Sequence, residues 1–274
     1  VSEGLSDLFW KRIISALIGI PVLVLLIYLG GIPLVVFVVL LALVGSYELM
    51  RIYRRMHYQV SQFLVYGSAF LFPLLAYFTP DGREGGCLFT GMIIYLILHM
   101  VLLVFAFPRF DIGDIAASYL GSCYISVLLC HLILIRKLTP YGLQLLLLVF
   151  LLTWACDIGA YFIGRLFGCR ALCPTLSPRK TIGGSIGGIL FCVGTAALFQ
   201  LLCPILSYPK VLLLGVITGF IVQIEDLVES AIKRMGKIKD SGTLIPGHGG
   251  VLDRFDSLLF SAPVAYFFIK LILF

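Results

Sequence analysis

Long, continuous runs of apolar residues, separated by short polar segments, dominate the chain. Nine of these runs approach the roughly 20 residues that an α-helix needs to cross the hydrocarbon core of a bilayer. They cover about residues 13–30, 32–50, 60–78, 89–107, 114–135, 141–163, 184–206, 210–232 and 255–274. Because the apolar positions do not alternate with polar ones, they indicate helices and argue against a β-barrel. The pattern predicts an all-α, polytopic integral membrane protein with about nine transmembrane helices.

The composition supports a membrane environment. Of the 274 residues, 61% are hydrophobic and 12% are charged, and the mean hydropathy is +1.09. A soluble domain carries about 25% charged residues and could not bury so much apolar surface. The net charge of +6 is small and scattered, which argues against a nucleic-acid partner and suits contact with anionic lipid. Most of the eight cysteines lie in apolar runs, so we interpret them as small hydrophobic residues.

The positive charges orient the predicted helices. If the N-terminus lies in the cytoplasm, most of the 20 Lys and Arg residues fall on the cytoplasmic side, as the positive-inside rule requires. An odd number of spans then puts the C-terminus on the outer side. Polar residues near the spans concentrate in the second half of the chain. We therefore expect residues 1–150 to form a scaffold of five helices, and residues 151–274 to form four helices and two cytoplasmic loops that carry a polar site.

Carboxylates gather at the predicted cytoplasmic ends of the last spans. They are Asp157, Glu225, Asp226, Glu229, Asp253 and Asp256. Helical spacing puts Asp226 and Glu229 on adjacent turns, and Asp253 and Asp256 on another shared face. Each alone could form a buried ion pair, as Glu229 could with Lys233 at i+4. Together they favour an Mg²⁺ site at the ends of spans eight and nine, because Mg²⁺ prefers oxygen ligands.

Two cytoplasmic loops accompany these carboxylates. The segment MGKIKDSGTLIPGHGGV contains Gly242, Gly247, Gly249 and Gly250, two lysines and His248, and these residues favour phosphate binding through exposed backbone amides over an ordinary solvated basic loop. The other loop carries a compact set of donors, Ser177, Arg179, Lys180 and Thr181. Gly184 and Gly188, which follow that set, form a GxxxG pattern that we interpret as a helix-packing site.

Residues 230–257, SAIKRMGKIKDSGTLIPGHGGVLDRFDS, resemble the signature of the phosphatidate cytidylyltransferases, also called CDP-diacylglycerol synthases. They fit S-x-x-K-R-x4-K-D-x-G-x3-P-G-H-G-G-x-x-D-R-x-D-S at every fixed position. The upstream segments DIGAYFIGRLFG and SPRKT also resemble that family, so the resemblance covers residues 151–257 well.

Two positions depart from the family pattern. The family usually has an acid where this chain has Gly183, and a glycine where this chain has Glu225. One hypothesis is that Glu225 fills the place of the missing acid, and the other is that it perturbs the metal site.

The resemblance implies transfer of the CMP group of CTP to phosphatidate, giving CDP-diacylglycerol and pyrophosphate, with Mg²⁺ and room for a second cation. The catalytic residues it implies are Asp226, Asp253, Lys233, Arg234 and His248. The metal ligands it implies are Asp226, Asp253, Asp256 and Glu229. The substrate-binding residues it implies are Ser177, Arg179, Lys180, Thr181, Lys237, Lys239, Asp240, Gly247, Gly249, Gly250 and Arg254.

The implied substrates also suggest a location and partners. CTP is soluble and phosphatidate stays in the leaflet, so we expect an active site that faces the cytoplasm, in a bacterial inner membrane. The expected partners are CTP, phosphatidate, membrane lipid and a second copy of the chain in a homodimer. The pattern DGxxAR…GxxxDxxxD of the CDP-alcohol phosphotransferases is absent. A polyprenol kinase and a cation channel stay open as rivals, although a channel would not explain KDSGTLIPGHGG.

Overall fold

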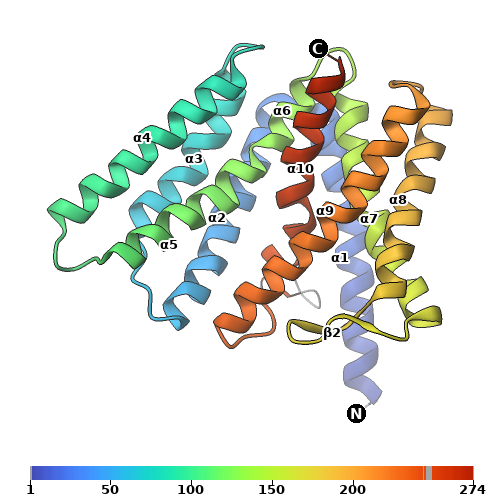
Figure 1. Ribbon diagram of the computed structural model, residues 1–274, viewed down its shortest axis with the longest axis horizontal. Helices are drawn as coiled ribbons and strands as arrows, with labels where there is room; N and C mark the ends of the chain where they lie inside the picture. The colour runs from blue at the N-terminus through green and yellow to red at the C-terminus, as the bar shows by residue number, and fades with distance from the viewer. Residues whose placement is uncertain (1, 243, 245–248, 274) are drawn as a thin grey trace. The chain divides into compact units, whose positions relative to one another are not determined.

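The computed structural model describes residues 2–242, 244 and 249–273, and almost all of these residues with regular structure are helical (Figure 1). The elements are α1 (Ser2–Leu29), α2 (Gly31–Arg55), α3 (Gln62–Phe78), α4 (Glu84–Phe105), α5 (Ile112–Ser122), the π-helix η1 (Cys123–Val127), α6 (His131–Lys137), α7 (Gly142–Phe167), β1 (Ala171–Cys173), β2 (Ser177–Thr181), α8 (Ile182–Leu202), α9 (Tyr208–Met235) and α10 (Leu252–Leu273).

Seven helical segments of the described chain are long and apolar enough to cross a membrane. Two further apolar helices, Leu17–Leu29 and Gln62–Phe78, are shorter. The 17 residues of α3 rise only about 26 Å at 1.5 Å per residue, slightly less than the roughly 30 Å hydrocarbon core. The polytopic helical membrane architecture is therefore confirmed, whereas by length and composition seven of the nine predicted spans qualify.

The chain forms two compact units whose boundaries differ from the predicted division at residue 150. Unit 1 comprises Val1–Leu134 and Met235–Phe255, and unit 2 comprises Ile135–Arg234 and Asp256–Phe274. Residue 150 lies inside α7, which continues without a break from Gly142 to Phe167. A boundary there would cut a single hydrogen-bonded helix, so the compact units cannot divide at that point.

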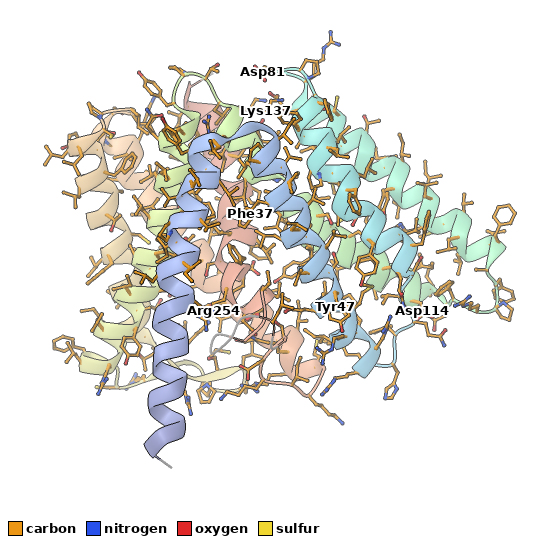
Figure 2. The ribbon with its side chains drawn as sticks, turned by 180° about the vertical axis from the view of Figure 1, so that it is seen from behind. Phe37, Tyr47, Asp81, Asp114, Lys137 and Arg254 are labelled. Carbon is orange, nitrogen blue, oxygen red and sulfur yellow. The ribbon has the colours of Figure 1, made fainter. Side chains whose placement is uncertain are left out.

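Unit 1 is built on α2, whose buried side chains follow a helical period from Leu34 to Tyr53. Serines link its helices through hydrogen bonds, with the backbone N–H of Ser61 donating to Oγ of Ser118 at 2.9 Å. Asp111 and Asp114 form a capping box at the start of α5. Figure 2 shows Tyr47, Asp114 and Arg254 at one end of this unit and Asp81 at the other.

In unit 2, glycines allow α7 and α8 to pack closely. A Cβ atom at Gly184 would lie 2.8 Å from the carbonyl oxygen of Ala160, and one at Gly188 would lie 3.0 Å from Sγ of Cys156. Real side chains do not approach so closely, so only glycine permits this helix separation. The packing role predicted for Gly184 and Gly188 is confirmed.

A small antiparallel hairpin, β1–β2, lies within the predicted loop between α7 and α8, where the all-α prediction included no strand (Figure 1). Ala171 pairs with Thr181 and Cys173 pairs with Ser177. Proline prevents a helix here because Pro178 lacks an N–H and restricts the residue before it to extended conformations. Thr181 ends the hairpin and caps α8, since its Oγ1 accepts a hydrogen bond from the N–H of Gly184 at 3.1 Å.

Candidate active site

A cavity of about 590 Å³ lies in unit 2, where α7 ends and α8 begins. Polar and charged side chains from α7, the hairpin, α8 and α9 line it. They include Asp157, Tyr161, Arg165, Ser177, Arg179, Lys180, Thr181, Ser185, Gln223 and Asp226. Its volume falls within the roughly 300–1,000 Å³ range of small-molecule sites. The four donors of the SPRKT segment and the carboxylate of Asp226 thus share one cavity.

The charges in this cavity suit an anionic ligand. Three cations, Arg165, Arg179 and Lys180, face two carboxylates, Asp157 and Asp226. Lys180 forms an ion pair with Asp226, and the two side chains are 30% and 28% exposed. Both members of the pair are therefore accessible to a ligand that enters the cavity. A phosphate can engage the cations, and a divalent cation can engage the carboxylates.

Gln223 fixes the side of α9 that faces the cavity. Its Nε2 donates to the carbonyl oxygen of Ser185 on α8 at 3.1 Å and to that of Gly219 at 2.7 Å. Asp226 follows three positions later and so lies on nearly the same helix face. This cross-link places the carboxylate next to the hairpin that carries Lys180.

A second group of charges in unit 2 is more buried. Lys233 and Glu229 form the predicted i,i+4 ion pair at 2.5 Å, with only 4% of the Glu229 side chain exposed. Asp256 is also buried and lies within electrostatic reach of Glu229, Asp226 and Asp157. Its Oδ1 accepts a hydrogen bond from the N–H of Ser257 at 2.8 Å. Unit 2 therefore brings Asp226, Glu229 and Asp256 into one acidic neighbourhood.

The donor chemistry of this neighbourhood fits Mg²⁺. Among the described residues, no group of three or more His, Cys, Asp or Glu side chains forms a preassembled metal cage. Mg²⁺ is commonly held by one or two carboxylates, water and substrate phosphates rather than by such a cage. Accessible Asp226, with Asp256 in reach, meets that requirement.

In unit 1, Asp253 fastens the glycine-rich segment that precedes α10. Its Oδ2 accepts hydrogen bonds from the N–H groups of Ser241 and Gly250, both at 2.9 Å. Gly249 has φ +89°, a left-handed conformation that favours glycine, and a Cβ there would lie 2.8 Å from the Asp253 carboxylate. The residues Gly247 and His248, predicted to bind substrate and to act in catalysis, lie outside the described residues.

Glu48 of α2 is the main site residue that sequence reasoning missed. It is buried and accepts hydrogen bonds from the N–H groups of Val251 and Leu252 at 3.0 and 2.8 Å. A signal existed, because Glu48 is the only charged residue between positions 31 and 50, and charges inside spans are functional candidates. This side chain of the predicted scaffold region thus holds the start of α10, and the division into scaffold and catalytic region stays a prediction.

Two glycines of this segment, Gly242 and Gly250, lie against the Glu48 carboxylate. A Cβ at Gly250 would lie 2.5 and 2.6 Å from the two carboxylate oxygens of Glu48. A Cβ at Gly242 would lie 3.0 Å from Cδ of the same carboxylate. Both glycines therefore make room for a carboxylate of the protein itself.

The remaining predicted substrate-binding and catalytic residues lie at the surface. Arg234, Lys237, Lys239, Asp240 and Arg254 are all exposed. Lys237 adopts a left-handed conformation, with φ 54°, in the turn that follows α9. Their roles stay predictions, as does metal binding by Asp226 and by Asp253.

The structure argues against Glu225 as a substitute for the acid missing at position 183. A Cβ at Gly183 would point at the carbonyl oxygen of Phe167, at 3.0 Å. Glu225 is fully buried and follows Gln223 by two positions, which is about 200° around the helix. Since Gln223 faces the start of α8, Glu225 points away from it.

Comparison with known proteins extends the resemblance to the whole chain. A model of the cytidylyltransferase family matches residues 10–272. A phosphatidate cytidylyltransferase of Bacillus subtilis is 33% identical over 267 residues, which cover 95% of this chain and 97% of the relative. One from Synechocystis is 32% identical, covering 96% and 97%, and one from Staphylococcus aureus is 32% identical, covering 92% and 96%. The chain belongs to the cytidylyltransferase family.

Proposed function

We propose that this protein transfers the CMP group of CTP to phosphatidate, releasing pyrophosphate and forming CDP-diacylglycerol for phospholipid synthesis. The relatives named above are called phosphatidate cytidylyltransferases, and they align with nearly the full length of this chain. The observation in the structure that supports it best is the cavity in which Arg179 and Lys180 lie beside Asp226. Cations for phosphate and a carboxylate for a divalent metal are what a nucleotidyl transfer between two anions requires.

In the proposed reaction, a phosphate oxygen of phosphatidate attacks the α-phosphorus of CTP. The bond from that phosphorus to the bridging oxygen of the β-phosphate breaks, and the pair of electrons leaves with pyrophosphate. The two reactants repel each other, so Arg165, Arg179 and Lys180 would neutralise their phosphates within the cavity. Ser177 and Thr181 would orient these phosphates by hydrogen bonding.

We propose four carboxylates as Mg²⁺ ligands: Asp226, Glu229 and Asp256 in unit 2, and Asp253 in unit 1. When bound, the metal would supply charge neutralisation at the transferred phosphate. Lys233, which is paired with Glu229, would balance that carboxylate before substrate binds. Arg234, Lys237, Lys239 and Arg254 would attract the nucleotide and the lipid phosphate, with His248 and Gly247 at the triphosphate.

We also propose an orientation and an assembly. The chain crosses the membrane nine times if Leu17–Leu29 of α1 and the short α3 are counted as spans. The distribution of Lys and Arg then puts the N-terminus in the cytoplasm, and the odd number of spans puts the C-terminus outside. The end of α7, the start of α8 and the end of α9 then face the cytoplasm, where CTP is available. Wide exposed apolar faces support a homodimer, which we place in a bacterial inner membrane.

The test is pyrophosphate release by purified protein in lipid vesicles supplied with labelled CTP, phosphatidate and Mg²⁺. We expect release that depends on phosphatidate and a labelled lipid product. Diacylglycerol in place of phosphatidate is the matched control, because it lacks the attacking phosphate. A product formed from diacylglycerol would indicate a lipid kinase, and ion flux without pyrophosphate release would indicate a channel.

The exchanged positions 183 and 225 give a further prediction. We expect the effects of Gly183→Glu and Glu225→Gly on kcat/KM to multiply within about twofold when combined, because separated sites behave additively. Glu225→Ala separates the loss of the carboxylate from the roughly 1 kcal/mol cost of glycine inside a helix. A double variant that is more active than both singles would show instead that one acid replaces the other.

A further inference from the structure

The carboxylate of Glu48 occupies the N-terminal end of α10 in unit 1. Helix starts leave backbone N–H groups without intrahelical partners, and here the N–H groups of Val251 and Leu252 donate to Oε1 and Oε2 of Glu48. The hydroxyl of Ser241 donates to Oε2 as well, at 2.9 Å. One buried side chain from α2 thus binds both sides of the glycine-rich segment.

Two carboxylates hold the two ends of this segment together. We call these ends, Ser241, Gly242 and residues 250–252, the neck. Asp253 holds the N–H groups of Ser241 and Gly250, and Glu48 holds the Ser241 hydroxyl. Gly242 and Gly250 lack side chains at the points where the Glu48 carboxylate meets the backbone. The neck is therefore a close-packed arrangement with matched donors and acceptors.

We propose that Glu48 is a positioning residue for the backbone at Ser241, Gly242 and 250–252, at the two ends of the glycine-rich segment. This proposal rests on the proposed function, in which that segment contacts the triphosphate of CTP. Because Glu48 fixes the neck before substrate binds, less conformational entropy is lost on binding. Glu48 touches neither CTP nor lipid, and acts through the backbone that it holds.

The arrangement requires a carboxylate rather than a side chain of similar shape. The two backbone donors use different oxygens of Glu48. A glutamine has one acceptor oxygen, so its NH₂ group would have to face either Val251 N–H or Leu252 N–H. One buried donor would then lack an acceptor, which costs about 1–3 kcal/mol in typical proteins.

The closing experiment compares Glu48→Gln with Glu84→Gln, a matched control. Glu84 is also buried in unit 1 and accepts a backbone hydrogen bond, from the N–H of Gly82 at 3.0 Å. We expect Glu48→Gln to raise the KM for CTP about tenfold, in line with one unpaired buried donor. The KM for phosphatidate should stay unchanged, and Glu84→Gln should leave both values unchanged. An unchanged KM for CTP in folded Glu48→Gln, or an equal rise in the control, would overturn the proposal.

A second measurement does not depend on enzymatic activity. Amide hydrogen exchange should become faster at Val251 and Leu252 in Glu48→Gln and stay unchanged there in Glu84→Gln. If exchange becomes faster in Glu48→Gln but the unmodified protein releases no pyrophosphate, the proposed function is refuted and the role of Glu48 in the neck is retained. Unchanged exchange together with normal activity of the unmodified protein would refute the neck alone.

A double-variant experiment at positions 48 and 242 tests the contact between the Glu48 carboxylate and Gly242. Gly242→Ala places a Cβ against the Glu48 carboxylate, so we expect a large loss of CTP affinity in the unmodified background. In Glu48→Ala the carboxylate is gone, and the nearest remaining atom to that Cβ is Cα of Gly250 at 3.3 Å. Gly242→Ala should then change the KM for CTP much less than in the unmodified background, since most of the clash was with Glu48. Independent, multiplying effects of the two changes would contradict the contact.

Discussion

Asp253→Asn is expected to reduce pyrophosphate release roughly 10³-fold or more while the protein stays folded, as expected when a charged group at a reacting centre is lost. The geometry explains why the fold should survive. The two 2.9 Å hydrogen bonds from Ser241 and Gly250 both reach Oδ2, and the amide oxygen of asparagine can take that position. The 3.2 Å contact from Ser241 to Oδ1 is lost. The change thus removes the charge available to Mg²⁺ and keeps the neck.

Asp114→Asn is the matched control for this experiment. Asp114 also accepts two backbone hydrogen bonds in unit 1, from Gln59 to Oδ1 at 2.7 Å and from Asp111 to Oδ2 at 3.2 Å, so the control loses one hydrogen bond as well as the charge. Its activity should stay within about threefold of the unmodified protein, because it lies outside the proposed site. Activity of Asp253→Asn that is retained, or recovered with excess Mg²⁺, would remove Asp253 from the metal ligands.

Asp226→Asn is expected to lower kcat roughly 10²- to 10³-fold, because it removes a carboxylate from the cavity that is proposed to bind metal and phosphate. Asp226 also neutralises Lys180, so a loss of activity has two possible causes. If the ion pair were the only role of Asp226, removing both partners would restore function, since an uncompensated charge causes the defect.

The double variant Asp226→Asn with Lys180→Met separates these causes. We expect it to be no more active than Asp226→Asn alone, because Asp226 is proposed to hold the metal and Lys180 to bind phosphate. Activity of the double variant above that of the single, measured by pyrophosphate release, would show that Asp226 serves only to balance Lys180. Asp81→Asn, in a loop of unit 1, controls for the loss of one negative charge.

Part of the candidate site was predictable because its signals are local. The spacing of Glu229 and Lys233 alone predicts their ion pair, since residues four apart are neighbours on a helix. Gly184 and Gly188 lie at the spacing that predicts helix packing. The segment SPRKT supplied the donors of the cavity by residue type, although its hairpin conformation was not anticipated.

Other parts needed the tertiary structure. Nothing in the spacing of residues connects Glu48 with Ser241, which are 193 positions apart. Nor does residue spacing connect Glu48 with Gly242 and Gly250. The glycine-rich composition of their segment suggested backbone amides that are open to a ligand. Only the packing of α2 shows that a carboxylate of the protein already faces them.

The amino-acid sequence by itself determined the membrane class, the helical spans and the type of chemistry, because transfer of apolar residues into lipid is nearly additive along the chain and the signature residues are contiguous. Tertiary structure alone decided which backbone donors each carboxylate receives and where the compact units divide. Those outcomes depend on contacts between distant segments, and such contacts leave no periodic trace in the order of residues.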